Sequence, residues 1–326
     1  MLLPLFILLL VGFFYGVLQG KFASVVVVAT MISSRSLLPR QAVILTAVGM
    51  GLGAYVLGSA VAGTIASEVI VPGGITLHGV IAGVSGAVIW NLIGLYFDLP
   101  VSISQALIGG LIGAVWVETG PQSLLGIGMV KLALGLFVSP VIGAVAGYLA
   151  VKLLYVLTTP ATPHLNRWLR HAQIVISFIM AMAIGSNDVQ KLLGVLMIGF
   201  LASGLYTSTH IPLELTLFGI STVMIGNLLS AWPLVRKLGT KFYKIRPIHG
   251  FGAQAVSSIT ILSSGAFGLP VSVSQIVTSA ILGAGSADRL QKVRWGVVVG
   301  ILWGWLLTIP TAAIFGAVLA ALLKGL

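Results

Sequence analysis

Cysteine is absent from the 326-residue sequence, and charged residues are scarce. Without cysteine the chain has no disulfide, no thiol nucleophile and no thiolate metal site. Asp, Glu, Lys and Arg make up only 7% of the residues, whereas a soluble domain carries roughly 25%. So few charges cannot cover a water-facing surface, which excludes soluble folds. The net charge of +11 comes from short basic clusters between apolar stretches, a pattern typical of membrane topology and not of nucleic-acid binding.

Hydrophobic residues make up 58% of the chain, and its 41 glycines are spread through apolar runs. A helix needs about 20 apolar residues to cross a membrane. On that basis the sequence predicts apolar segments at 3–32, 42–66, 76–97, 103–117, 126–157, 171–202, 213–235, 250–268, 275–286 and 295–323. The segments after Pro100 and Pro270 are too short to span and predict half-helices. We therefore expect an all-α polytopic membrane protein, with no cleavable signal peptide because no small-residue cleavage site follows the first run.

Four basic clusters predict the orientation, because cytoplasmic loops are rich in Lys and Arg. Placing all four inside leaves both termini outside and predicts a multi-pass protein of the cell (plasma) membrane. The clusters then serve as topology signals alone. They are Arg35 with Arg40; Arg167 with Arg170; Arg236, Lys237, Lys241, Lys244 and Arg246; and Arg289, Lys292 and Arg294.

An internal repeat is visible in the sequence. DLPVSISQ at 98–105 recurs as GLPVSVSQ at 268–275, and both are followed by similar stretches of small and apolar residues. Each half holds five segments, an odd number, so the second half enters the membrane upside down. Residues 1–157 then form the first repeat, 158–170 a cytoplasmic linker and 171–326 the second repeat. Inverted repeats with discontinuous helices are typical of secondary transporters, with the site between the repeats.

Asp188 is the acidic residue that lies deep within an apolar run, and a charge there indicates a functional site. With Asn187 and Gln190 it offers hard oxygen ligands that suit Na⁺, although a lone Asp serves equally as a proton acceptor. Lys191 follows three residues later on the same helical face. A purely structural Asp188–Lys191 ion pair is therefore the alternative, and it is compatible with a functional role.

Glycines flank this patch, so the helix could unwind there and free carbonyls for a cation. Aligning Gly20 with Gly185 pairs Lys21 with Ser186 and Ala23 with Asp188. The first repeat thus has no carboxylate at the position of Asp188, and Lys21 is expected to supply positive charge near the anion. Alternatively, this lysine reaches the membrane surface and has no role in the site. The second glycine of the patch is Gly194.

The two Pro-Val-Ser turns predict an anion site, because free N–H groups and the helix dipole at a helix start attract anions. For one turn alone, ordinary N-capping by serine is the competing explanation. Two copies at symmetric positions favour a shared midplane site. Its expected anion ligands are Ser102, Ser104, Gln105, Ser272, Ser274 and Gln275.

These motifs resemble those of the inorganic phosphate transporter family. GSNDVQK at 185–191 is similar to that family's GANDVQK signature, and SRSLLPRQA at 34–42, KFYKIRPIHG at 241–250 and WNLI at 90–93 resemble further family segments. The resemblance covers essentially the whole chain. It implies two inverted repeats, frequent homodimer assembly, and symport of phosphate with Na⁺ or H⁺ by alternating access.

Two departures from the family pattern concern the substrate. The first repeat lacks the usual Asn-Asp pair, and both turns end in Gln where the family has His. Because the site loses one carboxylate and gains a lysine, it is more positive, and fewer coupling cations are needed for a dianion. A site of donors alone suits sulfate, whereas a carboxylate can accept the proton of phosphate. Phosphate is expected, with sulfate as the alternative, which some family members with a degenerate first repeat carry.

Two other classes of function are weighed against a carrier. A passive anion pore would not need a carboxylate at the repeat interface. An enzyme would need a paired base, nucleophile or metal set, which a single buried Asp without Cys does not supply. We expect no enzyme activity and no cofactor apart from bound Na⁺.

Overall fold

The computed structural model describes residues 2–157, 163–230, 232, 235, 247–288 and 295–324, with the backbone alone for 163–167. This part of the chain is helical, and it contains no β-strand apart from an isolated bridge between Ile70 and Leu124. The basic clusters at 236–246 and 289–294, and Arg167, lie outside the described side chains. The prediction of an all-helical membrane protein is confirmed.

The helices follow the predicted segments closely. The first half contains α1 (Leu2–Ser33), α2 (Pro39–Val56), α3 (Ala60–Glu68), α4 (Leu77–Tyr96), α5 (Ile103–Glu118), a short 3₁₀ turn (Pro121–Ser123), α6 (Gly126–Ala133), a π-helical turn (Leu134–Val138) and α7 (Ser139–Leu157). The second half contains α8 (Pro163–Ala202), α9 (Leu213–Leu229), α11 (Pro247–Ala266), α12 (Val273–Asp288) and α13 (Trp295–Leu323). Because α8 begins at Pro163, the expected linker is helical from there on.

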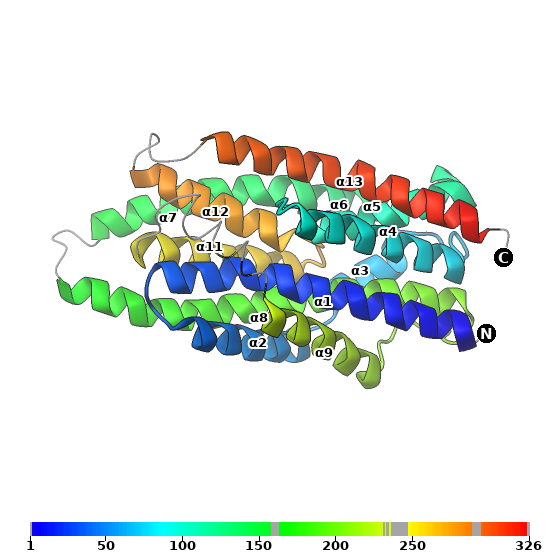
Figure 1. Cartoon of the computed structure of the whole chain (residues 1–326), viewed down its shortest axis with the longest axis horizontal. Helices are drawn as coiled ribbons and strands as arrows, with labels where there is room; N and C mark the ends of the chain where they lie inside the picture. Colours follow the sequence, from blue (N-terminus) through cyan, green and yellow to red (C-terminus); the bar gives the residue numbers. More distant parts are fainter. Residues whose placement is uncertain are drawn as a thin grey trace.

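The long helices lie side by side along the long axis of the molecule (Figure 1). Within the described residues, α1, α4, α6 with α7, α8 and α13 are each long and apolar enough to cross a membrane. α2 and α3 pass the same test together, but they are bent by 64°. The break corrects the single segment predicted at 42–66. It lies at Gly58, whose φ of 86° glycine adopts without steric cost.

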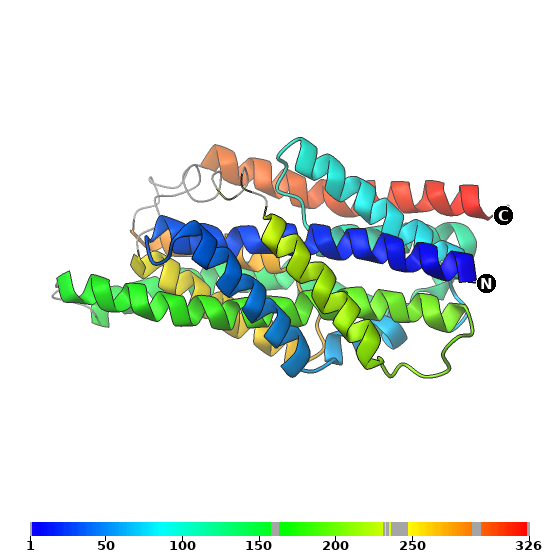
Figure 2. The ribbon, with the colours of Figure 1, turned by 60° about the horizontal axis from the view of Figure 1, so that its bottom comes forward.

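Both chain ends lie at one end of the bundle, and the α1–α2 connection lies at the other (Figures 1 and 2). α5 and α12 each have 16 residues and begin three residues after Pro100 and Pro270. The prediction of short helices after these prolines is therefore confirmed.

Glycines allow helices from the two halves to touch at the backbone. A Cβ at Gly20 of α1 would collide with the Val223 carbonyl of α9, and a Cβ at Gly185 of α8 would collide with the Met50 carbonyl of α2. Corresponding contacts join α5 to α13 and α12 to α7. Each half therefore packs its helices against partners from the other half, at matching positions.

Candidate functional site

The two Pro-Val-Ser turns meet in the middle of the bundle. The hydroxyl oxygens of Ser102 and Ser272, 170 residues apart, are 2.8 Å from each other, and both residues are fully buried. Ser102 also accepts a hydrogen bond from the backbone N–H of Gln105 at 3.3 Å, so it caps α5 as the ordinary explanation expects. Ser102 therefore both caps its own helix and contacts the other turn, which brings the starts of α5 and α12 together.

Lys191 of α8 ties the two turns together. Its Nζ donates to the Ser104 hydroxyl at 2.5 Å and to the Val271 carbonyl at 2.9 Å, and it pairs with Asp188 Oδ1 at 2.7 Å. Both charged residues are buried. An ammonium group has three donors, and these three acceptors use them all. The predicted Asp188–Lys191 ion pair is therefore present, and it lies between the two turns.

A small cavity lies beside this cluster. About 20 Å³ of it is open to water-sized molecules, which is room for about one water molecule. The two halves contribute to its wall from matching positions, so Ala23 and Asp188 line the same space. The lining residues are Gln19, Phe22, Ala23, Ile103, Ser104, Asp188, Val273 and Ser274.

The predicted cation ligands have different surroundings. Asp188 lines the cavity, and Asn187 is buried with neither amide atom hydrogen-bonded. Gln190, in contrast, accepts from the Val61 N–H at 2.8 Å and donates to the Ser186 hydroxyl at 2.8 Å. It satisfies the start of α3 and does not line the cavity, so the expectation that it is a cation ligand is not supported here.

Lys21 does not line the cavity, contrary to the expectation that it faces the anion. On a helix with 3.6 residues per turn it points roughly away from Gln19 and Ala23, which do line it. It is half-buried at this position. The buried cation of the site is Lys191 instead.

The expected unwinding of α8 is wrong, because the helix is continuous through the Ser186–Asp188 patch. Gly185 lets α8 lie against α2, and Gly194 lets it lie against Ala62 and Ile65 of α3. The glycines are thus explained by close helix packing.

Several buried amides lack hydrogen-bond partners for some or all of their side-chain atoms. Gln105 and Gln275 are buried, and the side-chain oxygen of each accepts no hydrogen bond. Sequence reasoning missed Gln19 and Asn91, whose amide atoms are all without partners although both residues are buried. The available signal for Gln19 was a polar residue directly before Gly20, in the stretch that aligns with the acidic patch.

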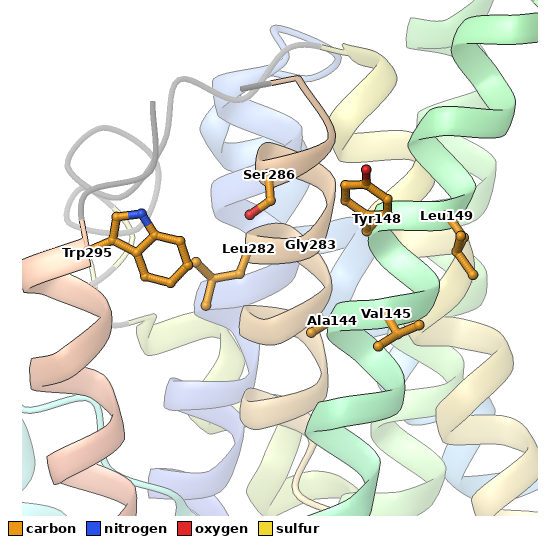
Figure 3. Close-up of a pocket in the computed structure, with 8 residues that line it drawn as sticks. All are labelled: Ala144, Val145, Tyr148, Leu149, Leu282, Gly283, Ser286 and Trp295. Atoms are coloured by element: carbon orange, nitrogen blue, oxygen red, sulfur yellow. The ribbon is translucent and has the colours of Figure 1, made fainter. Parts of the chain in front are cut away.

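A larger hollow lies on the outside of the bundle, between α7, α12 and the start of α13 (Figure 3). It is an open hollow of about 370 Å³, and its wall contains no Asp, Glu, Lys, Arg or His among the described residues. Leu149 and Trp295 are more than half exposed there. Such an apolar surface does not suit an inorganic anion, so we place the site at the small central cavity.

The chain is similar to known transporters. Residues 24–316 match the phosphate transporter family. A probable low-affinity inorganic phosphate transporter of Rhizobium meliloti is 33% identical over 95% of this chain and 93% of its own length. A protein of the same description from Bacillus subtilis is 32% identical over 89% of this chain and 88% of its own length. These relatives are named as transporters, in agreement with the prediction that the chain is not an enzyme.

A solved structure has the same fold. The chain is similar to a structure titled "The sodium-dependent phosphate transporter", with a TM-score of 0.87 and coverage of 99% of both chains. The sequence identity is 23%, so this likeness establishes the fold alone.

Proposed function

This chain belongs to the phosphate transporter family, and we propose that it is a secondary permease that carries inorganic phosphate together with Na⁺ by alternating access. The observation that carries the proposal is the contact of Ser102 with Ser272, beside the Asp188–Lys191 pair and a small cavity. Hydroxyls, helix starts and one carboxylate in a buried site match a small oxyanion and a cation.

The anion is held by the serine hydroxyls and the first backbone N–H groups of α5 and α12. Because Ser104 accepts from Lys191, its own O–H is free to donate to an anion oxygen. The present cavity has room for about one water, whereas phosphate has five heavy atoms. Binding therefore separates the hydroxyls of Ser102 and Ser272 and replaces their mutual contact with contacts to the anion.

The cation binds at Asp188. Lys191 occupies one of its carboxylate oxygens, Oδ1, which leaves the other for Na⁺, and the unpartnered amide of Asn187 supplies a further oxygen nearby in sequence. We propose Na⁺ rather than H⁺ because carboxylate and amide oxygens suit it, and because the solved structure with the same fold is titled as sodium-dependent. Asp188 and Lys191 cancel each other's charge, and Ala23 adds none, so this site needs fewer coupling cations than one with two carboxylates.

Alternating access follows from two inverted repeats, 1–157 and 171–326. The matching glycine contacts α1–α9 and α8–α2 support this symmetry. The cavity lies where both repeats meet, so rocking one set of helices against the other exposes it to either side. We further propose a homodimer in the plasma membrane, with both termini external.

Sulfate is the second candidate substrate. The observation that favours it is the single carboxylate of the cavity, whose Oδ1 is already paired with Lys191. Sulfate carries no proton for a carboxylate to accept, so the loss of an acidic residue at Ala23 removes a penalty against it.

Uptake by purified protein in liposomes tests the proposal. We expect labelled phosphate to accumulate when a Na⁺ gradient is imposed, with saturation and counterflow, and to accumulate poorly in choline medium. Replacing Ser102 and Ser272 together by Ala should raise the half-saturating phosphate concentration. Ser221→Ala, at an exposed hydroxyl on α9, is the matched control. Non-saturable flux without counterflow would indicate a pore and contradict the proposal.

A further inference from the structure

Gln19 of α1 is a buried amide without a partner at the central cavity. It is 2% exposed, it lines the cavity, and neither its Nε2 nor its Oε1 makes a hydrogen bond. Buried polar groups are nearly always hydrogen-bonded. An unsatisfied amide at this place therefore indicates a ligand that completes it.

The two repeats differ at Gln19 and in the residues that follow it. Gln19 aligns with Ile184, and Phe22 and Ala23 align with Asn187 and Asp188. Gln19 precedes Ala23 by four residues, so both lie on the same face of α1. The first repeat thus lacks the polar pair of the second and presents one neutral amide one turn away.

The hydrogen bonds at the cavity show which side-chain N–H groups are free to bind an anion. All three donors of Lys191 are used by Asp188, Ser104 and Val271. The lysine therefore orients Ser104 and has no N–H left for an anion in the cavity. Among the residues that line the cavity, Gln19 is the one with a free side-chain N–H.

We infer that Gln19 contacts the transported anion directly and is a specificity residue of this site. Its Nε2 donates to one anion oxygen, and its Oε1 accepts the hydrogen of a protonated one. Hydrogen phosphate uses both interactions, whereas sulfate uses only the donor. This inference rests on the proposed function, because it assumes that the cavity binds the anion.

Gln19→Leu tests this inference, because it keeps the size of the side chain and removes both polar atoms. A hydrogen bond to a charged group corresponds to a roughly ten- to hundredfold change in affinity. We expect the half-saturating phosphate concentration to rise by at least about tenfold, with a smaller rise for sulfate. The half-saturating Na⁺ concentration should change less than that of phosphate.

Stability separates a binding role from a structural one. Gln19 bonds no protein group, so Gln19→Leu should leave the unfolding temperature without phosphate unchanged or higher, and should reduce the increase that phosphate causes. Gln254 is the matched control, because its amide bonds Ser177, Gln173 and Thr30. Gln254→Leu should lower the unfolding temperature without phosphate. If Gln19→Leu fails to fold, Gln19→Glu keeps the shape and should weaken phosphate binding by charge repulsion.

The outcomes distinguish a failure of the proposed function from a failure of the role inferred for Gln19. If the wild-type protein neither transports nor is stabilised by phosphate or sulfate, the proposed function fails. If the wild type transports phosphate but Gln19→Leu has the same half-saturating concentration, the role of Gln19 is refuted. A lower unfolding temperature for Gln19→Leu, with unchanged phosphate affinity, would also refute it and assign Gln19 to the fold.

Discussion

The buried pair of Asp188 and Lys191 yields a quantitative prediction. Lys191→Met keeps a long apolar side chain but removes the three bonds to Asp188, Ser104 and Val271. The carboxylate of Asp188 is then left buried without its counter-charge, which costs about 3–5 kcal/mol in buried pairs of this kind. Asp188→Asn leaves the ammonium group unpaired and should destabilise the protein to a similar degree.

The double variant distinguishes pairing from general disruption. Asp188→Asn combined with Lys191→Met removes both charges, so only unsatisfied neutral acceptors remain, at about 1–3 kcal/mol for each buried one. Its unfolding midpoint in detergent should therefore lie above that of either single variant. Lys152→Met, at an exposed lysine of α7, should leave the midpoint nearly unchanged. If the double variant loses as much as the two single variants together, the charges do not stabilise each other and the description of the site is wrong.

Three further predictions concern coupling and packing. Ala23→Asp places a second carboxylate on the cavity wall opposite Asp188, and we expect the Hill coefficient for Na⁺ in phosphate uptake to rise; an unchanged Na⁺ dependence would argue against a cation at this wall. Asp188→Asn should abolish Na⁺-driven accumulation and retain some phosphate exchange, measured as counterflow in liposomes; unchanged accumulation would exclude Asp188 as the cation site. Gly185→Ala should destabilise the protein by more than about 2 kcal/mol because its Cβ meets the Met50 backbone. The control Gly300→Ala, in open space on α13, should be neutral or stabilising by about 1 kcal/mol. Equal unfolding midpoints for the two variants would contradict the packing described.

The long-range features of the fold could be predicted from the sequence because they depend on composition and on the internal repeat. The starts of α5 and α12 followed from proline, which resists continuation of a helix, and from the repeated serine turn. The break between α2 and α3 could not be predicted in the same way, because glycine occurs throughout the apolar runs. The positive φ at Gly58 depends on how the two helices pack against the rest of the bundle.

The site was predictable in its residue types and less so in their partners. Asp188 was identified because a charge is costly in an apolar run, and the serines were identified because their turn recurs at two helix starts. The roles of Lys191 and Gln190 depend on residues 80 to 129 positions away, such as Val271 and Val61. Helical phase alone places Lys21 away from Gln19, but only the three-dimensional arrangement identifies which face of α1 lines the cavity.

The most direct test of the central claim is uptake of labelled phosphate and labelled sulfate into liposomes under a Na⁺ gradient, each competed with the other unlabelled anion. We expect Na⁺-driven phosphate uptake that sulfate inhibits weakly, because Gln19 offers an acceptor for the phosphate proton, which sulfate lacks. Na⁺-driven sulfate uptake that is insensitive to phosphate would contradict phosphate as the substrate. It would show that the loss of the first-repeat carboxylate at Ala23 decides which anion is carried.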